Sequence, residues 1–300
     1  MKWRGGRRSS NIDDRRGQSS QRSGMRLPMP RSGGGKMSGL TLIIIIVGAL
    51  LFGVDPMTLL GGLTGGGGSV LPGAPSTTQP LTQADKEKGE FVAVVLGDTE
   101  DTWTRIFRQE FSQDYPEPKL VLFRGAVNTA CGSASSAVGP FYCPGDRQVY
   151  IDLSFFDELS RRFGAPGDFA QAYVIAHEVG HHVQTVLGIS KQVRAAQAKG
   201  SKTQSNALQV RMELQADCFS GLWANNIKGS QNVSLEAGDI DEALRAANAI
   251  GDDTLQRKSS GRLVPDSFTH GTSDQRKRWF RIGYEGGNFQ ACDTFGTDRL

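Results

Sequence analysis

The sequence predicts an α+β fold that is mainly helical with a small sheet and is preceded by a single transmembrane helix. Three observations support this prediction. Apolar residues recur at helical spacing through residues 168–186 and again through residues 206–227. Short runs rich in β-branched and aromatic residues, at 119–123 and 149–152, are typical of strands. An uncharged, strongly apolar run at residues 40–54 is typical of a membrane span.

Composition and charge narrow the class of protein. The chain has 300 residues, of which 38% are hydrophobic, and this is enough to bury a sizeable core. The net charge of +3 is unevenly placed, because the first 38 residues carry ten Lys or Arg against two Asp, a net charge of +8. The other residues carry 24 basic and 29 acidic side chains, a net charge of −5. Since the globular part is mildly acidic, we expect no nucleic-acid partner.

The chain divides into four parts. Residues 1–38, rich in Arg, Gly and Ser, are predicted to be a basic disordered cytoplasmic tail. Arg-Gly repeats can bind RNA, but a positive flank for the following span is the simpler interpretation. Residues 39–63 are the predicted transmembrane anchor. A cleaved signal peptide fits less well, because the basic region is too long and no cleavage site follows. Residues 64–83 read as a flexible linker, and residues 84–300 as the folded domain.

The positive flank also predicts orientation. Lys and Arg ahead of a span keep that end in the cytoplasm. We therefore expect a single-pass protein of the cytoplasmic membrane, with its N-terminus in the cytoplasm and its C-terminal domain outside.

Further elements follow from periodicity and from helix start signals. The segment between Cys131 and Pro144 is rich in Gly, Ser and Pro and is expected to be a structured loop or hairpin. Ser154 and Asp168 are the expected N-caps of two helices, and Gly188 is the expected stop of the second. In addition to the two helices already named, the sequence predicts helices at 85–96, 99–111, 154–163, 239–250 and 274–284.

Three of the four histidines lie within the sequence Ala-His-Glu-Val-Gly-His-His at positions 176–182. This stretch contains H-E-x-x-H, the zinc metalloprotease signature. His177 and His181 lie one helical turn apart on one face and can bind one Zn²⁺. Glu178, beside them, is suited to take a proton from a metal-bound water. An apolar stripe from Ala172 to Val186 predicts a helix buried against a core rather than a chance match on a surface helix.

A third metal ligand is expected from the helix at 206–227. Catalytic zinc usually takes three protein ligands and leaves one position for water. Glu213 and Asp217 share a helix face and match an arrangement in which Glu binds zinc and the following acid orients a ligand histidine. A solvated helix face is the alternative.

The four cysteines all follow the predicted anchor, which predicts two disulfides in an oxidising compartment. The preferred pairing is Cys131–Cys143, which closes a short loop, and Cys218–Cys292, which holds the C-terminal segment to the Glu213 helix; the other pairings stay open. A four-cysteine zinc site is an alternative, although no C-x-x-C is present. Cys218 as a metal ligand is another, which Glu213 makes unnecessary.

The fourth histidine, His270, precedes a helix that Ser273 or Asp274 would cap. A histidine beside the metal would stabilise the oxyanion that hydrolysis generates. A capping or surface histidine is the alternative. Arg276 and Arg278 are expected either to pair with acidic ligands or to face solvent.

Together these motifs resemble the bacterial family known as putative neutral zinc metallopeptidases, which are membrane-anchored. The resemblance covers nearly the whole chain, at residues 1–7, 13–17, 52–56, 131–132, 139–144, 177–184, 213–218 and 270–280. It implies that the membrane is the bacterial cytoplasmic (inner) membrane and that the C-terminal domain lies in the periplasm. It implies a zincin-like metallopeptidase domain. In zinc peptidases of this kind an edge strand before the metal helix holds the substrate backbone. Phe141–Tyr142 and Gln148–Ile151 are the candidates here, with ordinary sheet core as the alternative.

The predicted function is a membrane-anchored, zinc-dependent metallopeptidase that hydrolyses peptide bonds of envelope proteins or peptides. Glu178 would act as general base on a metal-activated water. The expected metal ligands are His177, His181 and Glu213. One alternative is a non-catalytic, zinc-containing envelope binding or scaffold protein, but a structural site has no use for Glu178. A deformylase-like amidase is a weaker alternative, since that class takes a Cys ligand ahead of its H-E-x-x-H.

Overall fold

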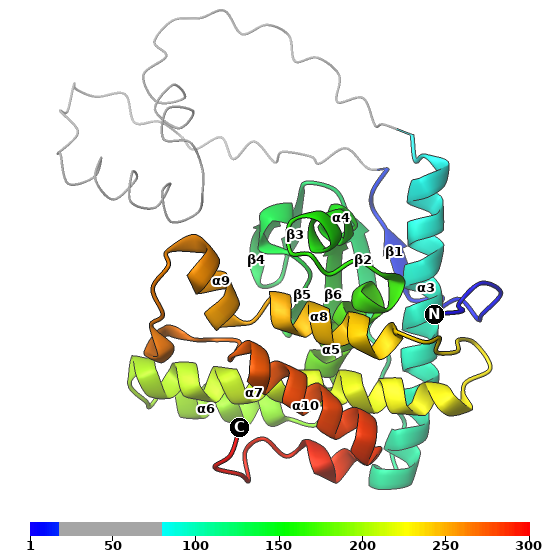
Figure 1. Cartoon of the computed structure of the whole chain (residues 1–300). Helices are drawn as coiled ribbons and strands as arrows, with labels where there is room; N and C mark the ends of the chain where they lie inside the picture. Colours follow the sequence, from blue (N-terminus) through cyan, green and yellow to red (C-terminus); the bar gives the residue numbers. More distant parts are fainter. Residues whose placement is uncertain (18–79) are drawn as a thin grey trace, which may run out of the picture. The chain divides into compact units, whose positions relative to one another are not determined.

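The computed structural model describes residues 1–17 and 80–300, which form one folded unit (Figure 1). Most of the secondary structure is helical and the rest forms small sheets, so the predicted α+β class is confirmed. The predicted anchor at residues 39–63 lies outside the described residues, as does the linker up to residue 79. Within the described residues, no helix is long and apolar enough to cross a membrane.

The strands confirm the predicted sheet and extend it. A four-stranded sheet has the order β1-β2-β6-β5, in which β1, β2 and β6 are parallel and β5 is antiparallel to β6. β3 and β4 form a separate antiparallel hairpin. The strands are β1 (Ile12–Asp14), β2 (Lys119–Phe123), β3 (Ala126–Thr129), β4 (Gly132–Ser135), β5 (Phe141–Cys143) and β6 (Gln148–Asp152). Of the two candidate edge strands, β5 lies at the edge, whereas β6 is paired on both sides.

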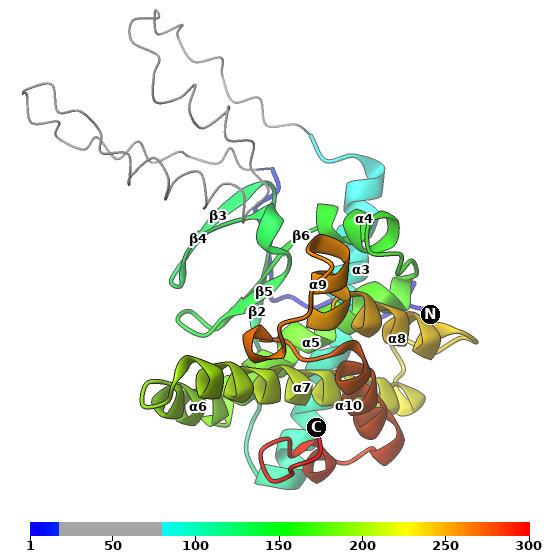
Figure 2. The ribbon, with the colours of Figure 1, turned by 60° about the vertical axis from the view of Figure 1, so that its left-hand side comes forward.

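The helices are α3 (Gln83–Ile106), α4 (Ser154–Arg161), α5 (Asp168–Val186), α6 (Ile189–Gln197), α7 (Lys202–Asn226), α8 (Asp239–Ala249), α9 (Asp252–Ser259) and α10 (Ser273–Gly286). α6 and α9 are short and were not predicted. α5 lies at the centre, between the sheet on one side and α7 and α8 on the other (Figures 1 and 2). Because α5 is covered on both sides, most of its residues are buried.

α5 and α7 approach each other closely at Gly180. A Cβ at this position would lie 3.1 Å from the Cα of Ala216. Since Gly180 lies between the two histidines of the motif, the absence of a side chain there allows the α7 backbone to come near both. The glycine in H-E-x-x-H thus helps to bring the Glu213 turn of α7 to the histidines.

α3 is one helix, whereas the sequence predicted two that broke near Gly97. A Cβ at Gly97 would lie 2.7 Å from the carbonyl oxygen of Arg7, so this glycine makes room for the N-terminal segment. The neighbouring Asp98 is buried and accepts a hydrogen bond from Trp223 Nε1 at 2.8 Å. Gly97 and Asp98, which suggested a break, instead contact neighbouring segments of the fold. The helix continues past them into a π-helical turn at Phe107–Phe111.

Two helices begin without the caps that the sequence predicted. Asp168 is the first residue of α5, and Glu242 Oε2 of α8 accepts the hydrogen bond from Phe169 N at 3.0 Å. Ser154 does not cap α4; its own N–H donates to Asp152 Oδ1 at 3.0 Å. In both cases the acceptor comes from another part of the fold or from the preceding strand, which helix-start rules do not consider.

Three helices, α3, α7 and α10, begin at reciprocal capping boxes. α7 starts at Lys202, four residues earlier than predicted, after such a box. α10 is capped by Thr272, whose hydroxyl accepts from Gln275 N at 3.2 Å, and not by Ser273 or Asp274.

Residues 1–17 belong to the folded domain, so the prediction of a disordered tail is wrong for them. β1 pairs with β2, and Ile12 lies opposite Leu120. Two of the arginines that suggested disorder, Arg7 and Arg8, bind carboxylates on α3. Arg7 Nη2 lies 3.0 Å from Glu100 Oε2 and 2.8 Å from Asp101 Oδ1. A composition rule counts the charges of a segment but not the opposite charges that it meets in the fold.

This pairing bears on the predicted anchor. A single crossing within residues 39–63 would place residues 1–17 and 84–300 on opposite sides of a membrane, where β1 and β2 could not pair. The predicted cytoplasmic location of the N-terminal segment, with the domain outside, is therefore incompatible with the folded unit.

Both predicted disulfides are present. Cys131–Cys143 joins the β3–β4 turn to β5, and Cys218–Cys292 joins α7 to the C-terminal segment. Because no cysteine is free, the four-cysteine zinc site and the Cys218 ligand are both excluded.

Candidate metal centre

Three predicted ligands meet where α5 and α7 approach each other. One ligand atom from each of His177, His181 and Glu213 lies within 4.8 Å of the other two. Glu213 Oε2 is 3.2 Å from His177 Nε2 and 3.5 Å from His181 Nε2. In a tetrahedral zinc site with bonds of about 2.0–2.1 Å, ligand atoms lie about 3.3 Å apart. The spacing and the His₂Glu chemistry therefore fit a Zn²⁺ ion.

Hydrogen bonds fix the tautomer of each histidine. Asp217 Oδ1 lies 2.9 Å from His177 Nδ1, and Gln184 Oε1 lies 2.9 Å from His181 Nδ1. Both acceptors hold a proton on Nδ1, so Nε2 is the nitrogen that faces the centre and that can bind a metal once its own proton is lost. Asp217 thus lies where the sequence predicted an orienting acid, and Gln184 is its counterpart for the second histidine.

Glu213 is oriented by the helix on which it lies. Its Oε1 accepts a hydrogen bond from Gln209 Nε2 at 2.9 Å, one turn earlier on α7. The other oxygen, Oε2, is the one directed at both histidines. Glu213 and His177 are each only 6% exposed, so the centre lies at the base of the site rather than on the surface.

The buried charges alter the acidity of the metal-free ligands. Burial by itself lowers the pKa of His177, but Asp217 and Glu213 outweigh it and raise the pKa to about 10. The pKa of His181 is raised as well, because Glu213 outweighs the effect of burial. Burial raises the pKa of Glu213, but the two histidines hold it well below its usual value. The metal-free site therefore holds protons that a metal ion must displace.

A cleft of about 760 Å³ opens onto this centre. Its lining includes the three candidate ligands together with Glu178, which is 8% exposed. Phe141 and Tyr142 of β5 form part of the wall, so the edge strand borders the cleft that contains the metal centre. The predicted general base, ligands and substrate strand are therefore brought together.

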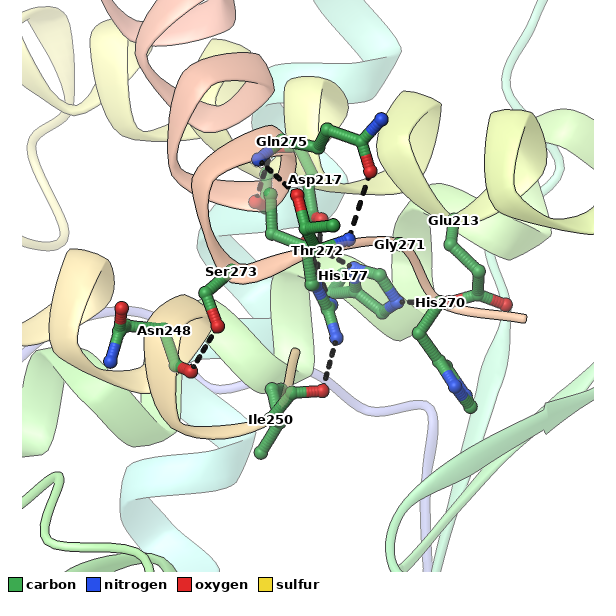
Figure 3. Close-up of polar contacts among 12 residues, drawn as sticks. His177, Glu213, Asp217, Asn248, Ile250, His270, Gly271, Thr272, Ser273 and Gln275 are labelled. Atoms are coloured by element: carbon green, nitrogen blue, oxygen red, sulfur yellow. Dashed lines mark hydrogen bonds and ion pairs between the residues drawn. The ribbon is translucent and has the colours of Figure 1, made fainter. Parts of the chain in front are cut away.

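His270 also lines the cleft, half-exposed, on the loop before α10 (Figure 3). Asp252 holds this loop: its Oδ2 accepts from His270 N at 2.6 Å and from Gly271 N at 3.0 Å. Asp252 Oδ1 lies 3.3 Å from His270 Nδ1, which leaves Nε2 as the nitrogen available to a ligand. Burial lowers the pKa of His270, and the Asp252 hydrogen bond and the charge of Glu213 outweigh this and raise it.

Several residues of the site were missed by sequence reasoning. Three of them lie one turn from a residue that was named: Tyr173 before His177, Gln184 after His181 and Gln209 before Glu213. Helical spacing is the signal that would have found them. Asp252 comes from a distant segment, and no local pattern indicates it. Arg276 was expected either to pair with acidic residues of the site or to face solvent, and it pairs with Asp217.

Comparison with known proteins shows the family of the chain. Residues 1–295 match the family described as "Putative neutral zinc metallopeptidase". The chain belongs to this family. The match includes residues 1–17, which agrees with their place in the folded domain. The family name implies zinc, in agreement with the His₂Glu centre.

Two relatives illustrate the spread of this metallopeptidase family. The chain is 49% identical over 304 residues to the uncharacterized protein YpfJ of Escherichia coli (strain K12), and the alignment covers 99% of each chain. It is 45% identical over 197 residues to the uncharacterized protein Rv2575 of Mycobacterium tuberculosis, which covers 62% of this chain and 65% of that protein. No solved structure matches the chain.

Proposed function

We propose that this domain is a zinc-dependent peptidase with Glu178 as its general base. The observation that carries the proposal is the shared cleft, in which two histidines and one glutamate at tetrahedral spacing lie with Glu178. Structural zinc sites are usually closed by four protein ligands, whereas catalytic sites have three and leave one position for water. A three-ligand centre at the base of a cleft favours catalysis.

The chemistry follows from the positions of these side chains. A zinc ion, when bound, lowers the pKa of a bound water and polarises the substrate carbonyl. Glu178 takes the proton of the attacking water and later donates a proton to the leaving amine nitrogen. His270, held through Nδ1 by Asp252, is positioned to donate from Nε2 to the developing oxyanion.

The edge strand favours an extended peptide as substrate. Among the strands that the structure describes, β5 pairs with β6 alone. A strand at the edge of a sheet can present backbone N–H and C=O groups to a further strand. Since Phe141 and Tyr142 of β5 line the cleft, a peptide that pairs with this edge would pass the metal centre. A deformylase-like amidase is disfavoured, because all four cysteines are in disulfides and none is left as a ligand.

The proposed location is outside the cytoplasm of a bacterial cell, at the inner membrane. Two disulfides support an oxidising compartment. The proposal includes attachment to the membrane through residues 39–63 without a complete crossing, with residues 1–17 on the same side as the rest of the domain; the pairing of β1 with β2 supports this arrangement. Envelope proteins or peptides are then the available substrates.

Location is tested with two single changes, Ser10→Cys and Ser259→Cys, at exposed serines of the N-terminal segment and of α9. A membrane-impermeant maleimide added to intact spheroplasts should label both equally. Labelling of position 259 alone would support the opposite-side arrangement and contradict the packing of β1. Labelling of neither, with both reactive after lysis, would contradict an extracytoplasmic domain.

Activity is tested on purified full-length protein with a peptide library, with new termini identified by mass spectrometry. Zinc-loaded protein should cleave, a chelator should abolish cleavage, and added Zn²⁺ should restore it. His177→Ala should lose both zinc and cleavage, whereas His270→Ala should retain zinc and lose turnover. Zinc-loaded protein that cleaves no peptide would favour the binding-protein alternative.

A further inference from the structure

A buried arginine on α10 contacts Asp217, the carboxylate that is hydrogen-bonded to His177 of the metal centre. Arg276 is 2% exposed, and its Nε and Nη2 donate to Oδ2 and Oδ1 of Asp217, each at 2.9 Å. Asp217 is fully buried on α7. Such a two-pronged contact fixes a carboxylate in plane and in distance, which a single point charge does not do.

The same carboxylate holds the histidine of the centre. Asp217 Oδ1 accepts from Tyr173 OH at 2.5 Å and from His177 Nδ1 at 2.9 Å. Arg276 Nη2 also donates to Tyr173 OH at 3.2 Å. Both oxygens of Asp217 are therefore occupied, and its position relative to His177 is determined by donors from α5 and α10 together.

Arg276 also contacts the segment that precedes α9. Its Nη1 donates to the carbonyl oxygen of Ile250 at 3.4 Å. Two residues later, Asp252 holds the loop of His270, and Asp252 N donates to Gly271 O at 2.9 Å. One guanidinium thus contacts both the carboxylate that orients His177 and the turn beside the His270 loop.

We propose that Arg276 is a positioning residue of the zinc centre, which sets the orientation of His177 through Asp217. The inference rests on the proposed function only in taking zinc as the metal. It predicts that zinc affinity depends on a side chain that is not a ligand and comes from a different helix. A merely structural arginine would affect folding but not zinc binding by the folded protein.

The test measures zinc dissociation constants of the full-length chain by competition with a chromogenic chelator, and thermal unfolding of the metal-free protein. Arg276→Met should weaken zinc binding roughly 10–100-fold, the usual effect of losing a group that orients a ligand. The matched control is Lys277→Met, whose ammonium pairs with Asp274 at the surface. This control should bind zinc as the wild type does.

A double-mutant cycle distinguishes positioning from general destabilisation. If Arg276 acts through Asp217, then Asp217→Asn weakens zinc binding and Arg276→Met adds little to it. Additive effects would overturn the proposal, as would Arg276→Met protein that is less stable but binds zinc with wild-type affinity.

Two milder variants keep the test decisive if Arg276→Met does not fold. Arg276→Lys retains the charge but not the two-pronged contact, and Tyr173→Phe removes one donor to Asp217. Both should weaken zinc binding, and wild-type affinity in folded Arg276→Lys would overturn the proposal. Zinc binding is measured without substrate, so failure to find any peptide cleavage would count against the proposed function and not against this inference.

Discussion

The zinc association constant of this protein should continue to rise with pH at values well above the usual pKa of histidine. In the metal-free centre, Asp217 and Glu213 outweigh the effect of burial and raise the pKa of His177 to about 10. The histidine must lose this proton to bind metal. At pH 7 about one molecule in 1,000 has the proton removed, so the observed affinity is about 1,000-fold below the limiting value.

The direction of this pH dependence follows from which state of the protein holds the proton. Because the metal-free protein holds it and the zinc-bound protein does not, raising the pH favours binding. From pH 6.5 to 8.5 the association constant should rise about 100-fold from His177 alone, with a further contribution from His181. Two histidines with an unperturbed pKa of about 6.5 would give only about a fourfold rise over that range.

The assay is chelator competition at a series of pH values, combined with calorimetry in two buffers of different ionisation enthalpy. At least one proton per zinc should be released at pH 7.5. Asp217→Asn is the control, because it keeps all three ligands but removes a charge that raises the pKa of His177. An association constant that is flat above pH 7, with no proton release, would refute this electrostatic account of the centre.

Two further predictions concern packing and ligand orientation. Gly283→Ala should destabilise the protein by about 1–3 kcal/mol or more in thermal unfolding, because its Cβ would lie 2.0 Å from a backbone carbonyl of α7. Gly286→Ala on the same helix, whose nearest neighbour is at 3.4 Å, should be tolerated, and equal melting temperatures would contradict the close α7–α10 contact. Gln184→Ala should weaken zinc binding roughly 10–100-fold by removing the acceptor of His181 Nδ1, whereas Gln192→Ala on exposed α6 should not. Unchanged zinc affinity in Gln184→Ala would show that this hydrogen bond does not orient the ligand.

Much of the centre could be predicted because its spacing is local. His177 and His181 on α5, and Glu213 and Asp217 on α7, are each one turn apart, so helical periodicity alone places them on shared faces. The prediction that the two helix faces meet did not come from periodicity. It came from the metalloprotease motif, which requires a third ligand. Two disulfides were expected from the cysteine count, and the pairing that was preferred among the open ones is the pairing present.

What could not be predicted depends on contacts between distant segments. Pairing of Arg276 with an acidic residue was one of two alternatives, but its partner Asp217 lies 59 residues earlier and no local pattern selects it. The His270 loop is held by Asp252, on a helix that periodicity did not indicate. The prediction of disorder for the N-terminal segment was wrong for the same reason. Its composition is typical of disorder, yet Arg7 and its neighbours find acidic partners on α3, which only the fold brings near.

Glu178 is the residue on which the peptidase account depends most. Glu178→Gln keeps the size of the side chain and leaves His177, His181 and Glu213 unchanged. The measurement is peptide hydrolysis per bound zinc, with zinc content determined on the same samples of wild type and variant. We expect equal zinc content and a fall in turnover of about 10²–10⁴-fold, the usual contribution of a general base. Hydrolysis by Glu178→Gln at the wild-type rate, with zinc bound, would contradict the proposed mechanism.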